Sequence, residues 1–165
     1  MKTGRQQFRI PRREHAVDEE IREDSYRELA KMPDPARCPK CGAAYLKGRW
    51  TWAKAPADAF AHKCPACQRI ADNIPGGYVS LKGPFLAEHH EDILNLVKAR
   101  EARAKQEHAL QRIIAIETVA DGTLITTTDA HLARNIAMAV HEAFKGTLDI
   151  NYSKDENLVR ATWKR

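Results

Sequence analysis

The sequence has no run of apolar residues long enough to cross a membrane, and residues 1–13 contain no apolar core of the kind found in signal peptides. It also lacks a glycine-rich phosphate loop, a Gly-x-Ser-x-Gly elbow and a His-Glu-x-x-His motif. These absences argue against a membrane protein, a secreted protein and several common catalytic architectures. We therefore expect a cytoplasmic protein that is not an enzyme.

Cysteine is scarce, and all four copies fall in two Cys-Pro-x-Cys pairs. The pairs are Cys38 with Cys41 and Cys64 with Cys67, and twenty-two residues separate them. This separation is slightly longer than the about fifteen to twenty residues usual between paired zinc knuckles. Four thiolates complete the tetrahedron that zinc takes in structural sites. The sequence therefore predicts one structural Zn²⁺ held by all four cysteines.

Two other interpretations of these cysteines remain open. Disulfides form in oxidising compartments, and nothing at the start of the chain directs it to one. A redox-active Cys-x-x-Cys motif normally stands alone, whereas this chain has two near-copies. Gly42 follows the first pair, where a tight metal knuckle needs a permissive backbone. Zinc is therefore favoured over both alternatives.

The positive charge of the chain is concentrated around the cysteines. Residues 1–33 hold eight Lys and Arg against seven Asp and Glu, residues 34–72 hold seven against three, and residues 73–165 hold twelve against twelve. Four thiolates around one divalent ion would remove two units from the middle part. A modest basic excess near the metal points to an anionic partner.

Two clusters of helix-breaking residues divide the chain, at residues 32–35 and 73–77. We expect a flexible charged arm over residues 1–33, because it has too few apolar residues to fold alone. A zinc ribbon with four cysteine ligands is predicted for residues 34–72 and an α+β domain for residues 73–165. At 165 residues the chain has room for these parts and little more.

Between the two cysteine pairs, residues 44–45 and 47–52 are typical of a short β-hairpin. Its two tryptophans, Trp50 and Trp52, have two possible roles. They can pack the small module, or they can stack on nucleic-acid bases beside the neighbouring Lys and Arg side chains. Packing is the more common role, and the sequence leaves the choice open.

Residues 73–165 show two helical and five strand patterns in the order strand, helix, strand, strand, helix, strand, strand. The first helix begins at Gly83–Pro84 and extends to about Glu107, and the second follows Thr128 or Asp129 and stops at Gly146. The expected strands are residues 78–82, 110–119 and 123–127 and a final hairpin on either side of residues 153–157. We predict an antiparallel sheet with two helices on one face, a sandwich of the split β-α-β kind.

Two groups place histidine beside a carboxylate, as an acid/base pair would require. They are residues 89–92, with the sequence His-His-Glu-Asp, and Asp129 with His131. Both groups lie at expected helix starts, where acidic residues are favoured by the helix dipole. We therefore interpret them as capping and surface residues and assign no catalytic residue.

The first pair with Gly42, then Tyr45, then Gly48–Arg49–Trp50, then the second pair, resembles a group of small bacterial zinc-ribbon proteins. That group is similar to the amino-terminal part of the nuclear-export adaptor of the large ribosomal subunit. The resemblance covers about residues 32–165, although the larger family has further Cys-x-x-Cys pairs and domains that this chain lacks. It implies zinc binding and docking to the large ribosomal subunit.

The sequence thus favours a zinc-binding protein that contacts RNA, ribosomal RNA or the ribosome above all, through the ribbon and the arm. The expected contact residues are basic or aromatic and surround the cysteines: Lys40, Lys47, Arg49, Trp50, Trp52, Lys54, Lys63 and Arg69. The alternative is a protein-interaction adaptor or a DNA-binding regulator without catalytic activity. No small-molecule substrate and no membrane partner are indicated.

Overall fold

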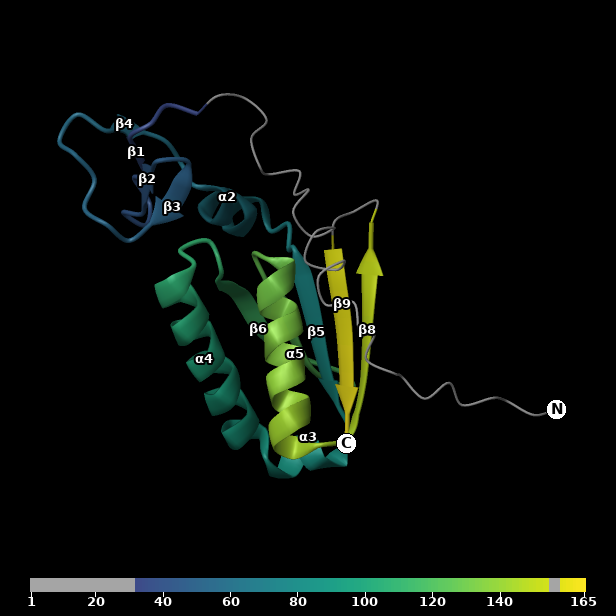
Figure 1. Ribbon diagram of the computed structural model, residues 1–165. Helices are drawn as coiled ribbons and strands as arrows, with labels where there is room; N and C mark the ends of the chain where they lie inside the picture. The colour runs from purple at the N-terminus through teal and green to yellow at the C-terminus, as the bar shows by residue number, and fades with distance from the viewer. Residues whose placement is uncertain (1–31, 155–157) are drawn as a thin grey trace.

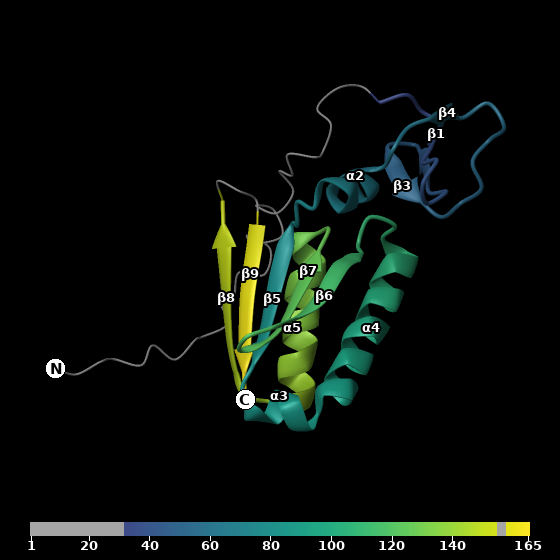
Figure 2. The same ribbon diagram turned by 180° about the vertical axis from the view of Figure 1, so that it is seen from behind.

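The computed structural model describes residues 32–154 and 158–165, so nearly all of the predicted arm lies outside the described residues. Two mixed sheets and four helices make up the described part, which has an α+β architecture (Figure 1). The smaller sheet and helix α2 (Pro65–Asp72) lie at one end of the larger sheet, and the carboxyl terminus lies at the other end (Figures 1 and 2). No helix in this part is both long and apolar enough to span a membrane.

Residues 34–72, called the metal module below, contain a four-stranded sheet and one helix. The strands are β1 (Ala36–Arg37), β2 (Ala44–Leu46), β3 (Arg49–Thr51) and β4 (Phe60–Ala61), in the order β3-β2-β1-β4, and the helix is α2 (Pro65–Asp72). The predicted hairpin is present as β2 and β3. Lys47 and Gly48 form its turn with φ angles of 52° and 78°, as a two-residue hairpin turn requires. Strands β1 and β4 and helix α2 were not predicted.

The larger sheet has the order β6-β7-β5-β9-β8. Its strands are β5 (Gly77–Lys82), β6 (Ile113–Val119), β7 (Gly122–Thr127), β8 (Thr147–Ser153) and β9 (Leu158–Lys164). Helices α4 (His90–Glu107) and α5 (Ala130–Phe144) cover one face, and the short α3 (Pro84–Glu88) closes the end away from the metal module (Figures 1 and 2). Strand β7 lies between β5 and β6, which is the split β-α-β connection expected from the element order.

The prediction of a purely antiparallel sheet is wrong, because β5 and β9 are parallel. The final hairpin places its second strand beside β5 and leaves β8 at the edge. Burial explains this choice. Val159, Ala161 and Trp163 of β9 are buried, whereas the corresponding positions of β8 are only partly buried. The strand with the more deeply buried side chains takes the inner position, where helix α5 covers it.

Two predicted boundaries also differ from the structure. The first long helix is interrupted at His89, which has φ −120° and ψ 25°, and the ring of Phe85 in α3 stacks on His89 with centroids 4.1 Å apart. Strand β6 begins at Ile113 rather than at residue 110. The residues before it turn toward the metal module, where Ala109 joins the buried cluster around the cysteines.

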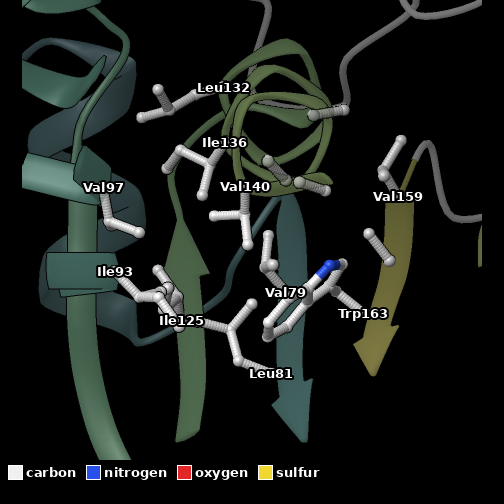
Figure 3. Packing of buried hydrophobic residues seen from close by; sticks show 14 of the residues in the cluster. Val79, Leu81, Ile93, Val97, Ile125, Leu132, Ile136, Val140, Val159 and Trp163 are labelled. Atoms are coloured by element: carbon white, nitrogen blue, oxygen red, sulfur yellow. The ribbon is translucent and has the colours of Figure 1, made fainter. Parts of the chain in front are cut away.

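The core of the larger sheet forms where α4 and α5 pack on it (Figure 3). Leu132, Ile136 and Val140 recur at four-residue steps along α5 and are fully enclosed, and Phe144 continues the stripe but is only partly buried. A Cβ at position 77 would collide with the Cβ of Ala133. Gly77, at the start of β5, therefore allows β5 and α5 to approach each other closely. The sheet therefore holds α5, and with it the loop before α5, close to the metal module.

Candidate metal centre

The first cysteine pair lies in a tight turn that follows β1. The amide of Gly42 donates to the carbonyl of Cys38 at 2.9 Å, and the amide of Cys38 donates to the carbonyl of Ala43 at 2.8 Å. Gly42 has φ 79°, in the left-handed region that favours glycine. The expected knuckle is therefore present, and it turns Cys38 and Cys41 toward the same point.

The second pair is not a second turn of this kind but the start of α2. Cys64 is the N-cap residue, its sulfur accepts the amide of Cys67 at 3.4 Å, and Pro65 occupies the first helical turn. Proline is favoured in the first turn of a helix, but cysteine is not among the usual capping residues and Cys38–Pro39 starts no helix, so the sequence carried only a weak signal for α2. The helix fixes the spacing of Cys64 and Cys67 on its first turn.

The four sulfur atoms come together in one cluster. All lie within 4.8 Å of one another, and the sulfurs of Cys41 and Cys64 are 3.7 Å apart. Four thiolates about 2.3 Å from one zinc ion would be separated by about 3.8 Å in a regular tetrahedron. All four cysteines are free thiols, and three are buried. The cluster can therefore hold one metal ion, and its ligand set suits Zn²⁺.

Arg112, just before β6, is the residue at this site that the sequence did not reveal. Its guanidinium donates to the sulfurs of Cys67 at 3.3 Å, Cys41 at 3.2 Å and Cys64 at 3.7 Å. Its Nε atom donates to the carbonyl of Ala109 at 3.0 Å. The side chain is 7% exposed. A buried arginine thus meets three of the four candidate ligands from a part of the chain more than forty residues away.

The electrostatics of the cluster differ from one sulfur to another. Burial raises the pKa of Cys64 and, although hydrogen bonds from Arg112 oppose it, also that of Cys67. Burial acts in the same direction on Cys38, but donors from the backbone of Cys64 and the first knuckle outweigh it and lower the pKa to about 6. For Arg112 the hydrogen bonds and charges of the cysteines outweigh burial and raise the pKa.

The structure separates the predicted nucleic-acid contacts into accessible and enclosed residues. Lys40, Lys47, Arg49 and Lys54 are exposed and Lys63 is half-buried. Arg69 is 4% exposed and its guanidinium donates to the carbonyl of Ile74, so it is not available to a phosphate. The prediction of Arg69 as a contact residue fails for this reason, because α2 packs it inward.

The two tryptophans have different environments. Trp50 is 9% exposed and its ring lies against those of Tyr45 and His62, which excludes it as a base-stacking surface and favours the packing role. Trp52 is 39% exposed, but its indole donates to the carbonyl of Lys105 at 2.6 Å. Trp52 therefore connects β3 to the end of α4, with one edge left open.

The two histidine groups behave as surface and capping residues. His89 is half-buried and Asp92 is exposed, and the Nδ1 atom of His89 lies 3.8 Å from a carboxylate oxygen of Asp92. Asp129 caps α5 by accepting the amide of Leu132 at 3.0 Å. Neither group lies at the sulfur cluster, which among the described residues contains only the four cysteines.

No family model, curated protein or solved structure matches this chain. The resemblance to the bacterial zinc-ribbon group therefore rests on the cysteine and Gly-Arg-Trp motifs alone. What the chain binds is inferred below from its own residues.

Proposed function

We propose that this protein binds RNA through the basic surface of a metal module that Zn²⁺ holds together. The observation that carries the proposal is the position of the accessible basic residues. Lys40 lies in the first cysteine knuckle, Lys47 and Arg49 lie at the hairpin turn, and all three are exposed. Such side chains can contact phosphates without any change in the fold.

The zinc ion has a structural role in this proposal. Four thiolates fill a tetrahedral coordination shell and leave no position for a water or a substrate. The module also buries few large apolar side chains. Its buried cluster consists of alanine, cysteine and Trp50. The metal therefore supplies the cohesion that a larger core would provide, and the module presents a surface and carries out no reaction.

The charge of the module remains positive when the metal is included. Residues 34–72 have seven basic and three acidic residues, a net charge of +4. Four thiolates and one Zn²⁺ together contribute −2, which leaves +2, and the adjacent Arg112 raises the local total to +3. Arg112 thus restores one of the two units of positive charge that the zinc and its four thiolates together remove.

Helix α4, whose basic and acidic residues balance at four each, continues the surface beyond the module. Its end lies beside Trp52, as the hydrogen bond to the carbonyl of Lys105 shows. Arg100 and Arg103, together with Glu107 and Glu142, line an open groove of about 640 Å³ between α4 and α5. A single strand of RNA that contacts the hairpin turn could continue along this helix. Ribosomal RNA is our first candidate because of the motif resemblance given above.

The test is the salt dependence of binding to purified large-subunit ribosomal RNA. Replacing Lys47 and Arg49 together by alanine removes two phosphate contacts. The slope of log K against log salt should therefore become shallower by about 1.4, since each contact to a single strand contributes about 0.7. Binding can be measured by filter retention across a series of salt concentrations.

Arg160→Ala with Lys164→Ala is the matched control, because both residues are exposed on β9, where they flank the exposed Thr162. It removes the same charge and should leave the slope unchanged. Equal slopes for the Lys47/Arg49 variant and the unmodified protein would overturn the proposal. Duplex DNA as a competitor distinguishes an RNA-binding protein from a DNA-binding regulator.

A protein-interaction adaptor is the second candidate, and exposed apolar side chains favour it. Phe60 on the edge strand β4 is 61% exposed, and Ile70 and Ile74 in and after α2 are 40% and 48% exposed. Burial of such apolar side chains against a partner is little screened by salt. A protein partner retained in high salt by the unmodified protein, and lost on Phe60→Ser, would favour this candidate.

A further inference from the structure

We infer that the metal–thiolate cluster is the surface on which residues 73–165 dock, and that Arg112 couples metal binding to this docking. The inference rests on the metal-binding part of the proposed function and is independent of RNA. It assigns Arg112 a role in positioning the metal ligands and in holding the two parts of the chain together.

The first reason for this inference is that the Arg112 side chain extends from the larger sheet to the cysteine sulfurs of the metal module. Arg112 belongs to the segment that leads into β6, yet its guanidinium reaches the sulfurs of Cys41, Cys64 and Cys67. A guanidinium has five donors in a rigid plane, so it can contact several thiolates at once. Sulfur atoms that coordinate a metal keep negative charge, and donors around them stabilise that charge.

The backbone of Arg112 is held firmly by the larger sheet. Its amide donates to the hydroxyl of Thr128 at 3.0 Å, and its carbonyl accepts the amide of Thr128 at 2.9 Å. The hydroxyl of Thr128 also donates to the carbonyl of Leu110 at 2.6 Å. Thr128 lies between β7 and the start of α5. A movement of the sulfur cluster would therefore act, through Arg112 and Thr128, on the position of these two elements.

The same contact region includes two further features. Ala109 is buried in the cluster formed by Cys38, Cys64 and Trp50. The ring of Trp52 lies 5.4 Å from the guanidinium of Arg112, while its indole donates to the carbonyl of Lys105. The segment from the end of α4 to the start of β6 therefore completes the core of the metal module.

Charge explains why the docking depends on the metal. Four metal-bound thiolates within 4.8 Å would repel one another strongly, and the divalent ion offsets that repulsion. Without the ion the four sulfurs no longer hold a concentrated negative charge, and the buried guanidinium loses its charged partner. A buried charge without a partner is unfavourable, so Arg112 should move to solvent and the module should separate from α4 and β6.

The experiment compares full-length Arg112→Met with the unmodified protein. Zinc affinity is measured by competition with a chelator, and amide hydrogen exchange is measured on the zinc-loaded proteins. We expect the variant to bind zinc about tenfold to hundredfold more weakly, which is the usual loss when a donor to a metal ligand is removed. Residues 105–112 and the hairpin around Trp52 should also exchange faster, while β5 and β9 keep their protection.

Lys98→Met is the matched control, since Lys98 is exposed on α4 and its replacement removes the same charge away from the sulfurs. It should change neither measurement. Arg112→Lys keeps the charge but has one nitrogen in place of the planar guanidinium, so it should lose a smaller part of the zinc affinity than Arg112→Met. If Arg112→Met does not fold, Arg112→Lys serves as the test.

Two results would overturn the inference. One is an Arg112→Met protein with the zinc affinity and exchange protection of the unmodified protein. The other is an unmodified protein whose residues 105–112 stay equally protected after zinc is removed. Neither result depends on RNA, so a failure of the RNA-binding proposal leaves this inference standing.

Discussion

The four cysteines are chemically unequal before a metal binds. Burial raises the pKa of Cys64 and Cys67, so both thiols carry protons near neutral pH. Cys38 has its pKa lowered to about 6 by the backbone donors that face it, and it is largely a thiolate at pH 7. A metal that needs four thiolates must therefore displace protons from both cysteines at the start of α2.

Zinc binding should release at least two protons at pH 7, from Cys64 and Cys67, because both must lose a proton to coordinate. The apparent affinity should consequently fall as the pH falls, by about a hundredfold per unit for two protons. Calorimetric titration in two buffers of different ionisation enthalpy measures the number released. A binding enthalpy that does not depend on the buffer would contradict this expectation.

Arg112 is the residue whose role only the three-dimensional contacts disclose. In the sequence it precedes a run of β-branched residues and is one of twenty-seven basic residues, with nothing to set it apart. In the fold it is buried against three sulfurs. The distance along the chain between Arg112 and the cysteines is the reason, since no local pattern reports a contact of this range.

At the scale of elements, the capping residues of helices α2 and α5 lie where the metal module meets residues 73–165. Cys64 caps α2 and is a candidate metal ligand, and Asp129 caps α5 immediately after Thr128, which holds the backbone of Arg112. Both caps use a side chain to satisfy an amide that the helix leaves without a partner. The local chemistry that begins a helix therefore also positions the site.

Asp129→Ala should lower the free energy of unfolding by about 1 kcal/mol, the usual cost of removing an N-cap acceptor. The amide of Leu132 would lose the carboxylate that it contacts at 3.0 Å. Urea denaturation followed by far-ultraviolet circular dichroism measures the change. Asp129→Asn keeps an acceptor oxygen and should retain most of the stability; an equal loss in both variants would show that the cap is not the cause.

At the scale of the whole molecule, two clusters of very different composition are joined. The cluster on the larger sheet consists of large apolar side chains such as Trp163, Leu81 and Ile93. The cluster of the metal module depends on cysteine and alanine. Apolar burial stabilises the first, whereas the second has too little apolar area to fold without its metal.

Removing the metal with a chelator should therefore unfold the metal module and leave the larger sheet folded. Near-ultraviolet circular dichroism should lose the signal of Trp50, which is buried beside the cysteines, while far-ultraviolet spectra keep most of the helical signal of α4 and α5. Restoring zinc should reverse the change. Loss of all structure in a single step on chelation would show that the larger sheet has no stability of its own.

The sequence by itself determined the features that depend on local patterns. The two Cys-Pro-x-Cys pairs predicted four metal ligands, and their sulfurs do cluster, because a short spacing fixes the geometry within each pair. The order of helices and strands in residues 73–165, the presence of a hairpin between the cysteine pairs and the cap at the start of α5 followed from periodicity and capping chemistry in the same way.

Only the tertiary structure decided the features that depend on contacts between distant residues. The parallel pairing of β5 with β9, the burial of Arg69 and Trp50, and the contact of Arg112 with the cysteine sulfurs are all of this kind. The strand whose side chains become most deeply buried takes the inner position in the sheet. A buried charged side chain is stable only where a group of opposite charge lies beside it. Both outcomes are set by competition among the residues of the whole chain, which no single segment contains.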